Sequence, residues 1–330
     1  MTSSRDVPGH GAGAYDLQHT EHLCREALRR DDLRQAATAL KQAGISELEG
    51  VRLVERVTED VATRAPIGRI NSRVLPDEAA ERRALERLLL VHTAIEALPR
   101  VPHLPVSDDV KRRLCAEFAF FAAEPTDAGW FDVETASFTA MCKLATFRRF
   151  PAGQFDWEVS GISRRDMLGV GARRLPATLA FVAFRMHGLG PVFFSHLNPR
   201  REHRSLLEGE ANRSYYRMAE AMALQPRIRG FAACSWFRSP ATHRASPRLA
   251  WLSDVFVENG GMVVESGPEN PHGGALARSA TRQRLYDAGQ FRPTRGLVLW
   301  PRAAMLAWAA RHPELAEDGV RPQGSDLPGV

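Results

Sequence analysis

The spacing of apolar residues changes near residue 150, and this change constrains the fold more than any other feature of the chain. Before it, apolar residues recur at intervals of three and four, as Leu85, Leu88 and Leu89 do, which is the period of an amphipathic helix. After it, short apolar runs alternate with helix-like segments and end at glycine or proline. The sequence therefore predicts an α/β fold in which a helical region, residues 16–150, precedes a mixed-sheet α/β domain, residues 151–316.

The second region is expected to alternate strands and helices. Two apolar runs, 178–186 and 191–196, are joined by His187-Gly188-Leu189-Gly190, which predicts a β-hairpin. The remaining expected strands cover 155–160, 228–237, 262–265 and 296–300. Helices are expected over 163–168, 210–224, 247–258 and 302–312, and around Tyr286. The ends of the chain, 1–15 and 317–330, are expected to be disordered tails.

Composition excludes a membrane-spanning protein and gives no indication of a metal site. The longest apolar runs fall far short of the roughly 20 residues that span a bilayer, and the first residues lack the apolar centre of a secretory signal. The four cysteines show no paired spacing, and no metal-ligand motif such as H-E-x-x-H occurs. We therefore expect a cytoplasmic protein without a metal or a disulfide framework.

Arginine dominates the basic residues of this chain. The formal net charge is +5, and only three of the 44 basic residues are lysines. This ratio is typical of a GC-rich bacterial genome, and no basic stripe interleaved with stacking aromatics is present, so a nucleic-acid partner is not expected. From His196 to Arg248, however, ten arginines outnumber four glutamates. That excess favours a ligand that carries phosphate over a metal.

A helix that ends at a glycine and leads into a buried strand is expected near the C-terminus. Leu285 and Tyr286 precede Gly289 and Phe291, and the apolar run 296–300 follows; Gly289 is where a left-handed C-cap residue is expected. This segment resembles the end of the GNAT acyltransferase fold. The resemblance implies that an acyl group passes from a CoA or carrier-protein thioester to an amine, and that Tyr286 protonates the leaving thiolate.

The resemblance also implies where the CoA pyrophosphate would bind. In GNAT enzymes a loop of the type Q/R-x-x-G-x-G/A, between a strand and a helix N-terminus, surrounds the pyrophosphate with backbone N–H groups. The corresponding loop here follows the second strand of the expected hairpin and holds Arg200, Arg201, Arg204 and Ser205. It has no glycine before Gly209, so the contacts would come from arginine side chains rather than from a closely approaching backbone.

Polar residues end several expected strands, where ligands of open α/β sheets tend to bind. His196 and Glu265 are the candidate general bases, and Ser235 and Trp236 are candidate substrate contacts. A histidine suits the role of base because its ordinary pKa is close to neutral pH. The alternative is that His196 caps the edge of the sheet by a hydrogen bond to a carbonyl.

A function of a different class is also open. A GNAT-like chain without the glycine loop could bind no CoA and instead use its helical half to engage a protein partner. The missing glycines favour this alternative. The arginine excess favours the acyltransferase, whose donor would be an acyl-CoA or an acyl carrier protein. The sequence indicates no oligomeric state.

Overall fold

The computed structural model describes residues 15–42, 44–59, 79–123, 136–198, 206–270, 274–277 and 279–316. The expected tails, 1–15 and 317–330, lie outside these ranges except for Tyr15. The chain divides into two units: the first comprises residues 1–160 and 193–205, and the second comprises residues 161–192 and 206–330.

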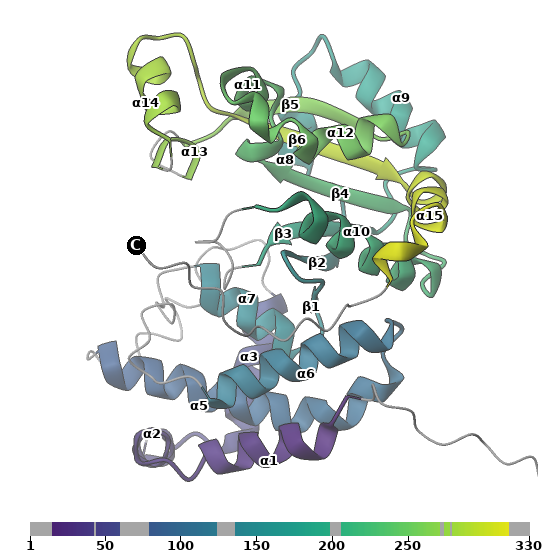
Figure 1. Ribbon diagram of the computed structural model, residues 1–330. Helices are drawn as coiled ribbons and strands as arrows, with labels where there is room; N and C mark the ends of the chain where they lie inside the picture. Colours follow the sequence, from purple (N-terminus) through teal and green to yellow (C-terminus); the bar gives the residue numbers. More distant parts are fainter. Residues whose placement is uncertain are drawn as a thin grey trace, which may run out of the picture. The chain divides into compact units, whose positions relative to one another are not determined.

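The first unit is built around one long helix (Figure 1). Its helices are α1 (Leu17–Ala27), α2 (Asp31–Gln42), α3 (Glu47–Glu59), α5 (Ala79–Ala97), η1 (Leu98–His103), α6 (Asp108–Ala123) and α7 (Ala136–Ala145). α5 packs against α1, α2, α3, α6 and α7. A helix with neighbours on several sides must bury most of its circumference, and residues 84–91 of α5 are all buried.

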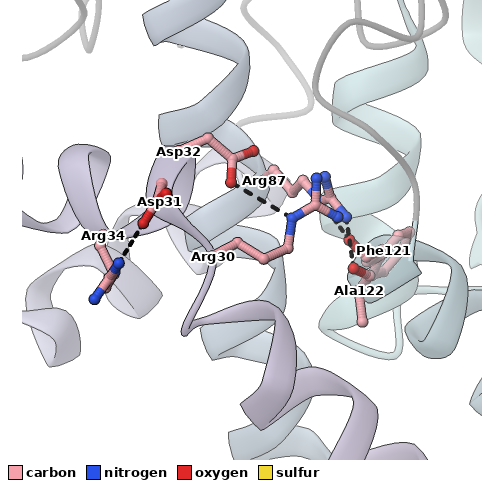
Figure 2. A network of polar contacts seen from close by, with 7 residues as sticks. All are labelled: Arg30, Asp31, Asp32, Arg34, Arg87, Phe121 and Ala122. Carbon is pink, nitrogen blue, oxygen red and sulfur yellow. Dashed lines mark hydrogen bonds and ion pairs between the residues drawn. The ribbon is translucent and has the colours of Figure 1, made fainter.

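Arg87 lies within this buried stretch of α5 and is hydrogen-bonded to the end of α6. Its Nε donates to the carbonyl oxygen of Phe121 at 2.8 Å, and its Nη2 donates to that of Ala122 at 2.5 Å. The last carbonyls of a helix have no partners within the helix itself, so Arg87 satisfies two of them. Figure 2 also shows two ion pairs near the start of α2, Arg34–Asp31 and Arg30–Asp32, whose side chains are more exposed than that of Arg87.

Three short strands complete the first unit, in the order β1-β2-β3: β1 (Arg149–Pro151), β2 (Phe155–Ser160) and β3 (Val192–Leu197). β1 and β2 are antiparallel, and Arg149 lies opposite Glu158. Successive side chains of a strand point to opposite faces. Trp157 is fully buried on one face, with its ring 5.6 Å from that of Phe193. Glu158 therefore projects from the other face of β2.

The second unit contains strands β4 (Gly230–Ser235), β5 (Met262–Pro268) and β6 (Thr294–Pro301). Their order is β4-β6-β5, and both pairs are antiparallel. The α-helices are α8 (Arg164–Gly169), α9 (Leu175–Arg185), α10 (Glu208–Ala223), α11 (Pro240–Ala245), α12 (Trp251–Glu258), α13 (Gly274–Ala277), α14 (Ala280–Asp287) and α15 (Arg302–Ala310). Short 3-10 helices are η3 (Trp236–Arg238), η4 (Pro247–Leu249) and η5 (Pro313–Leu315).

Trp300 on β6 is the centre of the aromatic core of the second unit. Its fully buried ring contacts Tyr215 of α10, Phe231 of β4, Phe256 of α12 and Trp308 of α15. These contacts join three helices to the two neighbouring strands β4 and β6. Aromatic pairs of this kind contribute beyond the area that they bury.

The predicted fold class is confirmed, because a helical N-terminal part is followed by an α/β part that contains strands and helices. The expected strands over 155–160, 191–196, 228–237, 262–265 and 296–300 correspond to β2, β3, β4, β5 and β6. The helices expected after residue 160 correspond to α8, α10, α12, α14 and α15.

The predicted β-hairpin is wrong, because residues 178–186 belong to α9 and its C-cap. Thr178 and Val182 are buried one helical turn apart, as expected for one face of a helix. His187 and Gly188 do not form a hairpin turn. Their positive φ angles, 57° and 101°, take the backbone out of the helical conformation, and the Gly188 N–H donates to the Val182 carbonyl oxygen near the end of the helix. A short apolar run fits either a strand or a buried helix, so periodicity alone did not separate them.

Candidate functional site

Three side chains from neighbouring strands form a polar row in the first unit. Arg149 on β1 lies opposite Glu158 on β2, and directly opposed residues of antiparallel strands project from the same face. His196 on β3 continues the row, because its Nε2 lies 3.1 Å from Oε1 of Glu158. Glu158 is therefore the centre of this row.

Lys143, in the last turn of α7, reaches the same carboxylate. Its Nζ donates to Oε2 of Glu158 at 2.6 Å, and the two side chains are only 16% and 14% exposed. Each oxygen of Glu158 thus has its own nitrogen partner, one from a helix and one from a strand. We call Lys143, Arg149, Glu158 and His196 the Glu158 cluster.

The environment of the cluster shifts the protonation of both Glu158 and His196. Burial alone would raise the pKa of Glu158, but hydrogen bonding and positive charge from His196 and Lys143 outweigh burial and lower the pKa to about 2. Burial lowers the pKa of His196 below its ordinary value of 6.5; Arg149 and Lys143 act in the same direction, whereas Glu158 opposes them. At neutral pH the site therefore holds an ionised carboxylate beside a neutral imidazole.

A second polar pair is formed by Asp156, two residues before Glu158 on β2, and Asn198, two residues after His196 and directly after β3. Nδ2 of Asn198 donates to Oδ1 of the fully buried Asp156 at 2.8 Å, and the Asn198 backbone N–H donates to the Gln154 carbonyl at 3.1 Å. From the Glu158–His196 contact to the Asp156–Asn198 contact, the residue number falls by two on one segment and rises by two on the other, as in antiparallel pairing. These contacts hold β3 in register, so they keep His196 at Glu158.

The low pKa of Glu158 predicts a specific loss of stability in acid. A carboxyl whose pKa is depressed in the folded state stabilises that state above its unfolded pKa. This contribution should be complete above about pH 5 and should decline as the pH falls from the ordinary carboxyl range toward about 2. Urea unfolding between pH 2.5 and 6 should show the difference between the parent and Glu158→Gln shrinking as the pH falls. A difference that is constant over this range would contradict the assigned contacts.

The remaining predicted site residues of the described chain lie in the second unit. Ser235 on β4 and Glu265 on β5 both lie opposite Gly296 of β6, so they flank the same position. Glu265 forms an ion pair of 2.9 Å with Arg244, which engages its carboxylate. The structure therefore groups Ser235 with Glu265, in a different unit from His196.

Tyr286 belongs to α14, and Trp236 of η3 contacts Arg282 of the same helix. The guanidinium of Arg282 lies over the Trp236 ring, 4.9 Å from its centroid, and Arg282 is almost fully buried. Tyr286 follows Arg282 by one helical turn and is half-buried, so it lies on the same side of α14. Gly289 has a φ of +69° just after the helix, as the sequence predicted.

The predicted pyrophosphate loop, with Arg200, Arg201, Arg204 and Ser205, lies outside the described residues. Its assignment stays a prediction.

Lys143, Arg149 and Glu158 were not predicted from the sequence. One available signal was the alternation of Asp156 and Glu158 with Trp157, which is typical of a strand that buries one face and carries polar groups on the other. Lys143 gave no signal, because its contact with Glu158 joins a helix to a strand 15 residues later.

No family model, curated protein or solved structure matches this chain. Within the described ranges, no group of three or more histidine, cysteine, aspartate or glutamate side chains is arranged to hold a metal ion. No helix of these ranges combines the length and apolarity needed to cross a bilayer.

Proposed function

We propose that this chain is an acyltransferase that moves an acyl group from a CoA or carrier-protein thioester to an amine, with His196 as the general base. The observation that supports the role of His196 is its 3.1 Å contact with the ionised Glu158. A carboxylate beside Nε2 favours the tautomer that carries its proton on Nε2, which leaves Nδ1 as the basic nitrogen. His196 is 30% exposed, so the imidazole is not sealed from substrate.

In the proposed reaction, His196 is the general base and a different residue is the general acid. Nδ1 takes a proton from the amine as the amine nitrogen attacks the thioester carbonyl carbon. The C–N bond forms, the C–S bond breaks, and the departing thiolate takes a proton, giving an amide and a thiol. Tyr286 is proposed as the acid because of the GNAT resemblance alone.

Supporting observations for the other candidate base, Glu265, are weaker. Its carboxylate already forms an ion pair with Arg244. Ser235, in the same row as Glu265, and Trp236 remain proposed substrate contacts.

The experiment is a titration of the full chain with acetyl-CoA by calorimetry, followed by detection of free thiol in the presence of a panel of amines. We expect saturable binding and thiol release that depends on the amine. Tyr286→Phe should slow release at least about tenfold without changing acetyl-CoA affinity. Tyr216→Phe, at another half-buried tyrosine, is the matched control.

The same experiment tests the alternative that the chain is a non-catalytic GNAT-like protein whose helical half binds a protein partner. Absence of both acetyl-CoA binding and thiol release would contradict the acyltransferase and favour this alternative. Full activity of Tyr286→Phe would show that Tyr286 is not the acid. The role of His196 is tested separately by a substitution of His196.

A further inference from the structure

Arg149 is a buried cation whose position in the Glu158 cluster leaves part of its guanidinium without a partner. The residue is only 7% exposed, and its Nε is buried with no hydrogen-bond partner among the described residues. Glu158 lies directly opposite on β2, and its two oxygens contact Lys143 and His196. These contacts leave Nε of Arg149 unsatisfied.

A buried guanidinium in this state favours an incoming anion. Charged groups are costly to bury unless they are paired and hydrogen-bonded. Arginine presents a planar fork of N–H donors that matches a carboxylate or a phosphate. Lys143 adds a second positive charge next to Glu158, so the cluster holds two cations against the single negative charge of Glu158.

We propose that Arg149 binds an oxyanion group, a carboxylate or a phosphate, of the substrate that His196 acts on. This deepens and rests on the proposed function, because it requires one substrate to carry an anionic group close to the base. The contact would use the N–H fork of Arg149 and would orient that substrate toward His196 across the row of strands.

The test measures oxyanion binding by the full chain without any thioester. The imidazole resonances of His196 are followed by NMR at pH 7 during titration with sodium acetate, sodium phosphate and, as a reference for ionic strength, sodium chloride. We expect saturable shifts with acetate, phosphate or both, and only small linear shifts with chloride. The arm that saturates at lower concentration identifies the class of anion.

Variants at Arg149 separate its role from general electrostatics. Arg149→Met keeps an unbranched side chain but removes the charge and the guanidinium, and it should weaken oxyanion binding at least tenfold. Arg149→Lys retains the charge without the fork and should also bind more weakly than the parent. Arg148→Met, at the exposed neighbouring residue, should bind like the parent. Far-ultraviolet circular dichroism of each variant checks that it is folded.

Bound oxyanion should also raise the pKa of His196. The groups around the imidazole are Arg149 and Lys143, whose charges lower this pKa, and Glu158, whose charge raises it. An anion bound to Arg149 would offset the positive charge of Arg149, which otherwise lowers the pKa of His196. Acetate and phosphate effects equal to those of chloride, or unchanged binding in folded Arg149→Met, would overturn the proposal.

The outcome is independent of the acyltransferase assay. Oxyanion binding that depends on Arg149 in a chain without acyl transfer would sustain the anion site and reject the proposed reaction. Amine-dependent acyl transfer without any Arg149-dependent oxyanion binding would do the reverse.

Discussion

Replacing His196 by glutamine should lower the rate of acyl transfer by about 10²- to 10⁴-fold, the range typical of a lost general base. Glutamine retains an N–H group that can meet Glu158, but it cannot take a proton from the amine at neutral pH. The affinity for acetyl-CoA should change little, because the loss falls on the chemical step. His19→Gln, on the exposed surface of α1, is the matched control and should keep the parent rate.

The pH dependence of the rate provides a second readout for His196. Because burial lowers the pKa of this imidazole, the base is already unprotonated at neutral pH, and the rate should reach its plateau below pH 7. The acidic limb should be absent in His196→Gln. A variant that retains the parent rate and the parent pH profile would show that His196 is not the base.

Replacing Arg87 by methionine should lower the free energy of unfolding by about 2–4 kcal/mol. Arg87 is fully buried, and its charged N–H groups donate to two carbonyls at the end of α6. Hydrogen bonds from a charged group are worth about 1.5–3 kcal/mol each, and the carbonyls left behind would be buried without these donors. Methionine fills similar space, so most of the loss should come from the polar contacts.

Urea unfolding of Arg87→Met beside Arg34→Met measures this effect. Arg34 pairs with Asp31 on the surface (Figure 2), and exposed pairs contribute about 0–1 kcal/mol. The two variants make the same substitution in the same unit, so their difference isolates burial and hydrogen bonding. Equal losses in the two variants would contradict a structural role for the Arg87 contacts.

The strands and helices that were predicted correctly have strong local signals. β2 alternates apolar and polar residues, and the helix around Tyr286 ends at Gly289, whose positive φ suits glycine. The segment that became α9 lacks such a signal: its apolar run has no polar alternation, and His187-Gly188 fits a helix end as well as a hairpin. In the structure only Thr178 and Val182 of this helix are buried, so its apolar run does not mark a buried strand.

The candidate site was predictable only in part, because its members come from four elements. His196 was identified from its place at the end of an expected strand. Its partners were not, because Glu158 meets it through pairing of β2 with β3, and α8 and α9 separate these strands along the chain. Arg149 belongs to β1, a strand of three residues, which is too short to give a periodic pattern.

An NMR titration of the His196 imidazole tests most directly whether burial keeps His196 neutral beside the ionised Glu158, ready to accept a proton. We predict a pKa below 6.5 in the parent chain and a still lower pKa in Glu158→Gln, because the carboxylate is the group that raises it. A pKa at or above 6.5 in the parent, or the same value in folded Glu158→Gln, would show that His196 is not a neutral base in contact with an ionised Glu158.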